Sequence, residues 1–128
     1  MPNRAIDTPA APRAIGTYSQ AVHSGNLVFL SGQIPLSPQT MELIGPDIRA
    51  QITQVFDNLK AVAFAAGGAL DQTVKLTVYL TDLAHFPTVN EVMAIYFAAP
   101  YPARATVQVA ALPRGALVEV DAILSLQP

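Results

Sequence analysis

A helical repeat of apolar residues between Asp47 and Ala66 is the feature that most constrains the fold of this 128-residue chain. Asp47 can cap the N-terminus of such a helix, and Gly67-Gly68 can end it. The sequence therefore predicts an amphipathic helix over residues 47–66. Its apolar residues recur at the spacing of one buried helix face: Ile48, Ile52, Val55, Phe56, Leu59, Val62, Ala63 and Ala66.

Alternation of side chains predicts the strands that accompany this helix. Over residues 73–80, Val74, Leu76, Val78 and Leu80 are expected to point to one side of a sheet, and the residues between them to the other. Further strands are predicted over residues 21–23, 27–30, 41–44, 105–110 and 117–126.

The remaining elements complete the predicted fold. A second helix is expected over residues 86–98, where Pro100 and Pro102 end the helical spacing. Residues 1–20 are expected to be irregular, because three prolines interrupt them. The order β-β-β-α-β-α-β-β predicts an α+β fold, with two helices packed on one mixed sheet. Since the chain has no repeats or linkers, residues 1–128 are expected to form a single domain.

Charged residues are scarce. They make up 12% of the chain, about half of the share that is usual for soluble domains. Hydrophobic residues make up 52%, so part of the surface is expected to lie against something other than water. No stretch approaches the roughly 18 apolar residues of a spanning helix, and the N-terminus lacks the apolar stretch of a secretion signal. We therefore expect a cytoplasmic homo-oligomer that does not contact membranes.

Residue types exclude several classes of site. The chain has no cysteine, which excludes disulfides, thiolate nucleophiles and zinc–thiolate centres. His23 and His85 have no suitably spaced partners, so no metal site is expected. The net charge is −2, the isoelectric point is near 5.5 and no basic cluster is present. Nucleic acid is therefore not an expected partner.

The last two predicted strands carry the candidate chemistry. Arg104, Thr106 and Gln108 alternate on one face of the first, and Glu119 and Asp121 on one face of the second. If these strands are neighbours, all five side chains share a polar face. Gln108 and Asp121 fit a solvated surface. Arg104 and Glu119 fit either a carboxylate-binding site or a salt bridge within or between subunits, and by themselves they indicate no reaction.

Five segments follow the pattern of a known family. They are residues 15–21 (IGTYSQA), 29–35 (FLSGQIP), 101–106 (YPARAT), 109–115 (VAALPRG) and 118–122 (VEVDA). In order and spacing they resemble the Rid family, the reactive-intermediate deaminases that are also called YjgF-like or endoribonuclease L-PSP proteins. The resemblance runs from about residue 5 to the C-terminus.

This resemblance implies a chorismate-mutase-like domain that assembles as a homotrimer, with the sheets in a central barrel and ligand sites between subunits. It also implies a hydrolase that deaminates 2-imino acids and enamines to 2-oxo acids and ammonia. The implied substrates are 2-iminobutanoate and 2-iminopropanoate. Because an imine carbon is already electrophilic, orientation and one general acid–base group suffice without a metal or another cofactor.

The resemblance also implies roles for individual residues. Arg104 would bind the substrate carboxylate through both arms of its guanidinium, and Glu119 would hold or activate the attacking water. The other implied cleft residues are Tyr18, Ser31, Gly32, Asn90 and, through its backbone, Thr106.

Two positions depart from the family pattern. Thr106 stands where many deaminating members have cysteine, and this difference bears on the expected substrate range. Thr17 stands where proline is common, which would loosen the loop around Tyr18.

Two other functions compete with deamination. A non-catalytic protein that binds or senses small carboxylates, or a chaperone-like protein, would use the same clefts without turnover. An endoribonuclease that inhibits translation is disfavoured by the acidic isoelectric point, by the absence of a basic patch and by the lack of a histidine pair for acid–base chemistry.

Overall fold

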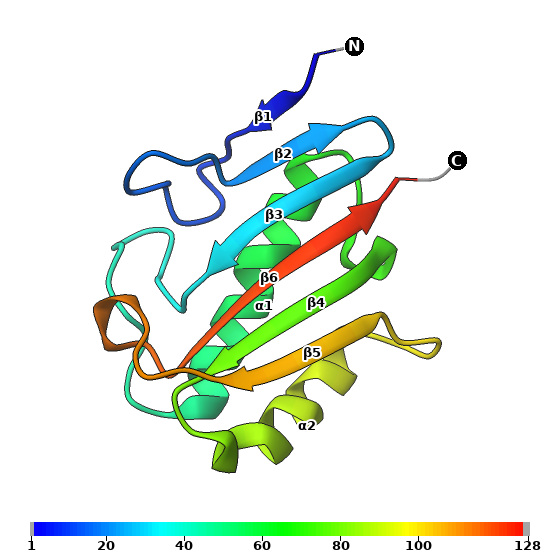
Figure 1. The fold of residues 1–128 in the computed structure, drawn as a ribbon. Coiled ribbons are helices and arrows are strands. Elements are labelled where there is room, and N and C mark those ends of the chain that lie inside the picture. The colour runs from blue at the N-terminus through cyan, green and yellow to red at the C-terminus, as the bar shows by residue number, and fades with distance from the viewer. Residues whose placement is uncertain (1, 127–128) are drawn as a thin grey trace.

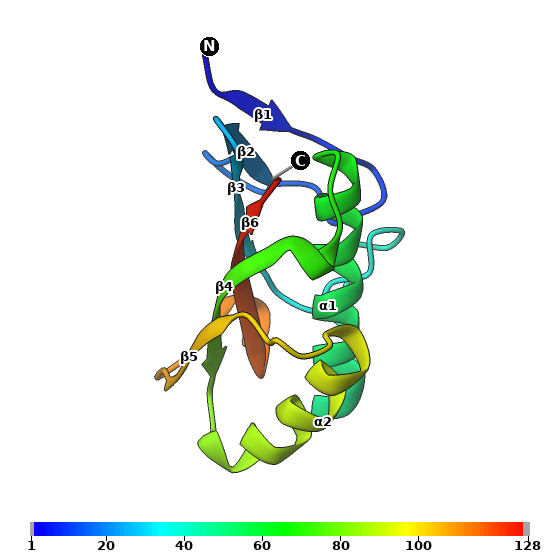
Figure 2. The same ribbon diagram turned by 90° about the vertical axis from the view of Figure 1, so that its right-hand side faces the viewer.

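A computed structural model describes residues 2–126 and contains one mixed sheet with two helices on one of its faces (Figures 1 and 2). In chain order the strands are β1 (Arg4–Ile6), β2 (Ala21–Ser24), β3 (Leu27–Gln33), β4 (Thr73–Leu80), β5 (Ala103–Gln108) and β6 (Val118–Ser125). Their order in the sheet is β1-β2-β3-β6-β4-β5. β4 and β5 run parallel, and the other neighbouring pairs are antiparallel. The predicted α+β fold is confirmed.

The long helix α1 (Ile48–Ala65) begins and ends where its sequence predicts. The carboxylate of Asp47 accepts a hydrogen bond from a backbone N–H of the first turn at 3.1 Å. At the other end, Gly67 has a φ of +89°, and the N–H of Gly68 donates to the carbonyl of Ala63 at 3.0 Å. A side chain would strain this left-handed turn, so the glycine ends the helix and directs the chain toward β4.

The core lies between α1 and the sheet. Alternate side chains of β3, β4 and β6 face the helices and are almost fully buried, whereas the other face of the sheet carries no helix (Figure 2). Burial of one such side chain contributes about 1.5–3 kcal/mol to stability. The buried sheet residues are Val28, Leu30, Leu76, Val78, Leu80, Val118, Val120, Ala122 and Leu124.

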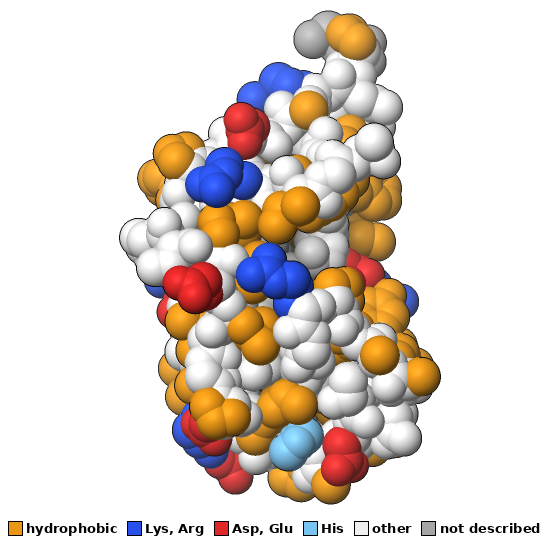
Figure 3. Space-filling view, turned by 90° about the vertical axis from the view of Figure 1, so that its left-hand side faces the viewer, with side chains coloured by type: hydrophobic (Ala, Val, Ile, Leu, Met, Phe, Trp, Pro, Cys, Tyr) orange, Lys and Arg blue, Asp and Glu red, His pale blue; other side chains and the backbone are white. Residues whose placement is uncertain are grey.

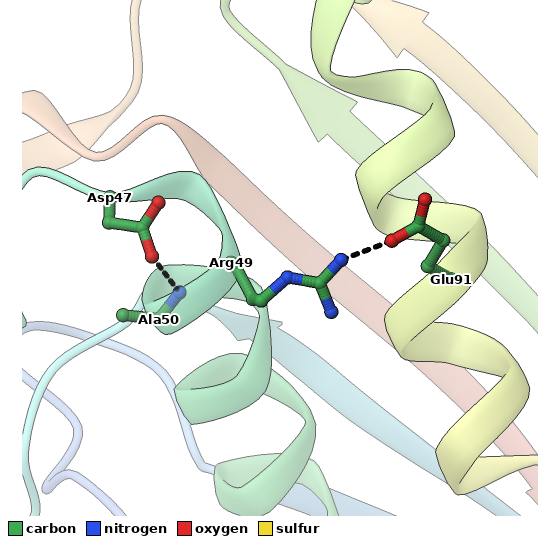
Figure 4. Close-up of polar contacts among 4 residues, drawn as sticks. All are labelled: Asp47, Arg49, Ala50 and Glu91. Carbon is green, nitrogen blue, oxygen red and sulfur yellow. Dashed lines mark hydrogen bonds and ion pairs between the residues drawn. The ribbon is translucent and has the colours of Figure 1, made fainter.

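The second helix, α2 (Phe86–Tyr96), lies beside α1 on the same side of the sheet (Figure 2). Arg49 of α1 pairs with Glu91 of α2 across the gap between the helices (Figure 4). Both side chains are at least half exposed, so this pair contributes little to stability. α2 ends before the predicted residue 98, because the backbone of Phe97 is extended and its ring is buried in the core. No helix within residues 2–126 is long and apolar enough to cross a membrane.

Two predictions in the N-terminal part of the chain are wrong. Residues 4–6, expected to be irregular, form β1 and pair with β2, with Arg4 opposite His23. Residues 41–44, expected to form a strand, make only an isolated bridge between Leu36 and Leu43. A strand of three residues at the edge of a sheet is too short to show alternation, so its pairing depends on tertiary context.

A β-bulge changes the side-chain pattern predicted for β4. Thr73 and Lys75 pair with the adjacent residues Leu124 and Ile123 of β6, so Val74 is an extra residue between them. As a result Thr73 is buried and Val74 is 46% exposed, although alternation predicts Val74 on the apolar side. From Leu76 onward the predicted alternation is confirmed.

Candidate active site

β4 lies between β5 and β6, so the two strands that carry the candidate residues are not neighbours. Arg104, Thr106 and Gln108 lie opposite the buried side chains of β4 and therefore on the helix side of the sheet. Glu119 and Asp121 lie opposite its outward side chains and therefore on the side without helices. The predicted common polar face is wrong, because the register of β4 aligns Arg104 and Thr106 with its buried residues and aligns Glu119 and Asp121 with its outward residues.

Four of the predicted site residues line one pocket of about 500 Å³. Glu119 comes from β6, Ser31 and Gly32 come from an irregularity in β3 opposite β6, and Tyr18 comes from the loop before β2. Figure 3 looks onto the side of the molecule where these loops lie, and basic side chains are visible there among hydrophobic ones.

The backbone at Gly32 makes room for the Glu119 carboxylate. A Cβ atom at this position would lie 2.2 Å from Oε2 of Glu119, well inside contact distance. The neighbouring Ser31 fixes the loop that leads to Tyr18, since its hydroxyl donates to the carbonyl of Ser19 at 2.6 Å. The phenol oxygen of Tyr18 in turn accepts a hydrogen bond from the N–H of Ile15 at 3.1 Å. These contacts hold the wall of the pocket in place.

The pocket has further polar lining residues that were not predicted from the sequence, among them Gln20, Arg13 and Arg114. Gln20 is buried, and its amide nitrogen donates to the carbonyl of Pro12 at 2.8 Å while its oxygen accepts from the N–H of Thr8 at 2.7 Å. It thereby fixes the segment that forms one wall. Arg13 and Arg114 also line the pocket. Gln20 and Arg114 lie within two of the family-like segments, residues 15–21 and 109–115, whereas Arg13 lies outside them, and only the folded chain brings the three together.

The ionisation of Glu119 depends on its surroundings. Partial burial raises the pKa of the Glu119 carboxyl above its usual range, and the negative charge of Asp121 on the same strand raises this pKa further. The hydroxyl of Tyr79 on β4 donates to Oδ2 of Asp121 at 3.0 Å, and this bond raises the pKa of Tyr79. A carboxyl whose pKa is raised toward neutrality can both accept and return a proton, as general acid–base chemistry requires.

Arg104 and Asn90 line a second pocket of about 440 Å³. Arg104 leaves β5 toward α2, where its Nη1 donates to Oδ1 of Asn90 at 2.6 Å. Its guanidinium also lies 4.9 Å from the centre of the Phe86 ring, a cation–π contact. Within residues 2–126 no carboxylate forms an ion pair with Arg104. The guanidinium is therefore oriented by neutral groups and can bind an external carboxylate.

Thr106 lies on the same face of β5 as Arg104. Its hydroxyl oxygen is buried and has no hydrogen-bond partner among residues 2–126. β5 is also the last strand of the described sheet, so one edge of its backbone has no neighbouring strand there. Such an edge exposes N–H and C=O groups that can bind a ligand or another chain.

The structure thus divides the predicted site residues into two groups. One pocket is lined by Tyr18, Ser31, Gly32 and Glu119. The other is lined by Asn90 and Arg104, and Thr106 lies on the same strand as Arg104. No three His, Cys, Asp or Glu side chains within the described chain are grouped so that they could hold a metal ion.

Comparison with known proteins places this arrangement in a family. The family model for endoribonuclease L-PSP matches residues 8–125. The chain belongs to the L-PSP family. Protein DfrA of Myxococcus xanthus is 54% identical over 125 residues, which cover 96% of this chain and 95% of DfrA. The 2-iminobutanoate/2-iminopropanoate deaminase of Dermatophagoides farinae is 44% identical over 126 residues, which cover 98% of both chains.

A solved structure of the L-PSP family has the same fold. The crystal structure of RidA from the Antarctic bacterium Psychrobacter sp. PAMC 21119 has a TM-score of 0.93 and 53% sequence identity, and the match covers 95% of this chain and 98% of that one. The resemblance to the Rid family that the sequence segments indicate is confirmed.

Proposed function

We propose that this L-PSP family protein is a hydrolase that deaminates 2-imino acids and enamines to 2-oxo acids and ammonia, with 2-iminobutanoate and 2-iminopropanoate as substrates. The observation that carries the proposal is a pair of complementary groups: a guanidinium at Arg104 that has no acidic partner among residues 2–126, and a carboxyl with a raised pKa at Glu119. Membership of the family and the deaminase name of a relative that matches over 98% of both chains support it.

Arg104 would bind the carboxylate of the substrate. Asn90 and Phe86 fix the direction of its guanidinium, so little conformational entropy is lost when a carboxylate binds to the remaining N–H donors. The planar fork matches a carboxylate and would hold the adjacent imine carbon in one orientation. Tyr101 and Pro102, which line the same pocket, would exclude water from this ion pair.

Glu119 would transfer the protons of the reaction. Its carboxylate takes a proton from water as the water oxygen bonds to the carbon of the protonated imine, which gives a neutral carbinolamine. The protonated carboxyl then returns this proton to the nitrogen. As the C–N bond breaks, the hydroxyl proton of the carbinol passes to the Glu119 carboxylate, and ammonia and the 2-oxo acid form. Glu119 finally gives this proton to the ammonia, which leaves as ammonium. A general acid–base group of this kind contributes about 10²–10⁴-fold to the rate.

A second copy of the chain would be needed to complete the site. Within one chain the sheet separates Arg104 from Glu119, so a substrate bound to one group does not reach the other. The proposal therefore includes the homotrimer that the family resemblance implies, together with a location in the cytoplasm. It is supported by large apolar side chains that are exposed on the open face of the sheet and beside β5: Leu27, Phe29, Tyr101 and Val107.

An imine-hydrolysis assay tests the proposed activity. An amino-acid oxidase generates 2-iminobutanoate or 2-iminopropanoate in situ, and semicarbazide traps the imine that survives. The wild-type protein should reduce the trapped imine. Arg104→Ala should lower kcat/KM by about 100-fold or more, the effect of losing two charge-assisted hydrogen bonds. Arg49→Ala, which removes an exposed arginine of α1, should leave kcat/KM unchanged.

Two outcomes would overturn the proposal. A folded wild-type protein that does not accelerate imine loss is not a deaminase of these substrates. If that protein nevertheless binds 2-oxobutanoate and Arg104→Ala does not, the function is carboxylate binding without turnover.

A further inference from the structure

The pocket at Glu119 is larger than a four-carbon substrate needs. Its volume of about 500 Å³ lies within the range of about 300–1,000 Å³ that is usual for drug-sized ligands. Much of its wall is apolar, with Ile15, Ile34 and Leu36 among the lining side chains. A substrate bound through its carboxylate and imine carbon would leave this part of the pocket free for a longer side chain.

Two arginines also line this pocket, and hydrogen bonds hold the segments that carry them. Arg114 has a φ of +62°, and its Nη2 donates to the carbonyl of Met41 at 3.2 Å. Arg13 follows Pro12, whose carbonyl accepts the hydrogen bond from buried Gln20. The two guanidiniums therefore extend from anchored segments of the chain, and basic side chains are prominent on this side of the molecule (Figure 3).

The charge of the pocket is unbalanced. The charged residues of its lining are two arginines and one glutamate. Within residues 2–126 neither Arg13 nor Arg114 forms an ion pair, and both side chains are exposed. Unpaired guanidiniums beside an apolar surface favour a ligand that has an apolar body and an acidic end, because a carboxylate is the group that the planar fork binds best.

We propose that Arg13 and Arg114 form a second anion subsite, which binds the side-chain carboxylate of a 2-imino dicarboxylic acid such as 2-iminosuccinate or 2-iminoglutarate. This inference rests on the proposed imine hydrolysis and defines its substrate class. The first carboxylate of the substrate binds Arg104 of a second copy of the chain, the methylene groups pack on the apolar wall, and the second carboxylate binds the arginine pair. An acidic imine is thereby preferred over an apolar one of similar length.

The ratio of two rates tests this subsite. Glutamate oxidase generates 2-iminoglutarate, an L-amino-acid oxidase generates 2-iminobutanoate, and kcat/KM is measured for both imines. In the double variant Arg13→Gln/Arg114→Gln the ratio of the acidic to the apolar substrate should fall about tenfold or more, the effect of losing a charge-assisted hydrogen bond. Arg4→Gln removes a positive charge outside the pocket, where Arg4 contacts His23, and should leave the ratio unchanged.

The outcomes separate failure of the subsite from failure of the proposed activity. If both imines are hydrolysed and the double variant keeps the wild-type ratio, the subsite is wrong and the activity stands. If neither imine is hydrolysed, the proposed activity is wrong, and calorimetry with the stable product 2-oxoglutarate still tests the subsite. Wild type should then bind 2-oxoglutarate more tightly than 2-oxobutanoate, and equal affinities would overturn the inference. Should the double variant fail to fold, Arg13→Gln alone is used, because the Arg13 side chain is exposed and makes no ion pair within residues 2–126.

Discussion

At the scale of single residues, Gly32 and Glu119 act as a unit. The carboxylate of Glu119 lies over the backbone of Gly32, in the space that a Cβ atom would fill. The glycine therefore has a steric role that does not involve an unusual backbone angle. The position of the Glu119 carboxyl depends on the absence of a Cβ atom at Gly32 in the neighbouring strand.

Gly32→Ala should displace the Glu119 carboxylate and lower kcat for imine hydrolysis by about 10–100-fold, because a general acid–base group must lie within hydrogen-bond reach of the reacting atoms. Steady-state kinetics on 2-iminobutanoate measure the effect. Gly45→Ala is the matched control, since a Cβ at Gly45 meets no atom within 4 Å. Equal rates for both variants would show that the carboxylate does not need this position.

The raised pKa of Glu119 also predicts how stability depends on pH. Between the ordinary value of 4.5 and the higher pKa in the folded state, the folded protein binds more protons than the unfolded chain. Stability therefore falls as the pH rises through this window. Glu119→Gln removes the ionisable group, so its Tm should exceed that of wild type at pH 7.

Thermal unfolding across a pH series checks this sign. The difference in Tm between Glu119→Gln and wild type should disappear below pH 4.5, where the carboxyl is protonated in both states. Glu42→Gln, which changes an exposed carboxyl, should not reproduce the stabilisation. A lower Tm for Glu119→Gln at pH 7 would mean that the charged form is stabilised in the fold.

At the scale of elements, the packing of α2 on β5 positions Arg104. Asn90 on α2 accepts a hydrogen bond from one nitrogen of the Arg104 guanidinium. We expect Asn90→Ala to raise KM about tenfold with a smaller change in kcat, because the lost contact stabilises the bound substrate and the transition state equally. Glu91→Gln is the control, because Glu91 lies next to Asn90 in sequence but pairs with α1. A fall in kcat at constant KM would instead indicate that Asn90 contacts the reacting atoms.

The same elements show how far the sequence predicts this fold. α1, most of β4 and the buried side of β6 follow from periodicity, because each buries one face along many residues. The position of β4 between β5 and β6 does not follow, because no local pattern states which strands pair. The sequence motifs therefore named both Arg104 and Glu119 as site residues, while the reasoning that put them on a single face failed.

Gln20, Arg13 and Arg114 show the same limit within the site. Each comes from a segment outside the strands and α-helices, and each reaches the pocket through tertiary contacts. The role of a buried amide or of an arginine without an acidic partner becomes clear only when its contacts in the folded chain are known.

At the scale of the whole molecule, the sheet divides the proposed active site into two halves. Each site of a trimer would take Arg104 from one copy and Glu119 from another. Arg104→Ala and Glu119→Gln should each be inactive alone. Unfolded together in equal amounts and refolded, they should recover about a quarter of wild-type activity, because random assembly gives that fraction of sites both native groups.

The activity of this mixture is measured against each variant refolded alone and against refolded wild type. Activity no higher than the sum of the two separate variants would mean that each chain carries a complete site. Size-exclusion chromatography of every sample confirms that differences in assembly do not explain the rates.

The two edges of the sheet differ in a way that bears on misassembly. β1 offers three residues, one of them the charged Arg4, and is a poor template for another strand. β5 offers six residues, and most of their side chains are exposed. If the proposed trimer forms, a newly made chain that has not yet bound other copies would expose the β5 edge, and strands of other chains could add to this edge and form fibres. A lysine in place of the exposed Val107 would protect such a chain from aggregation, and it would also weaken the proposed trimer if that trimer buries Val107.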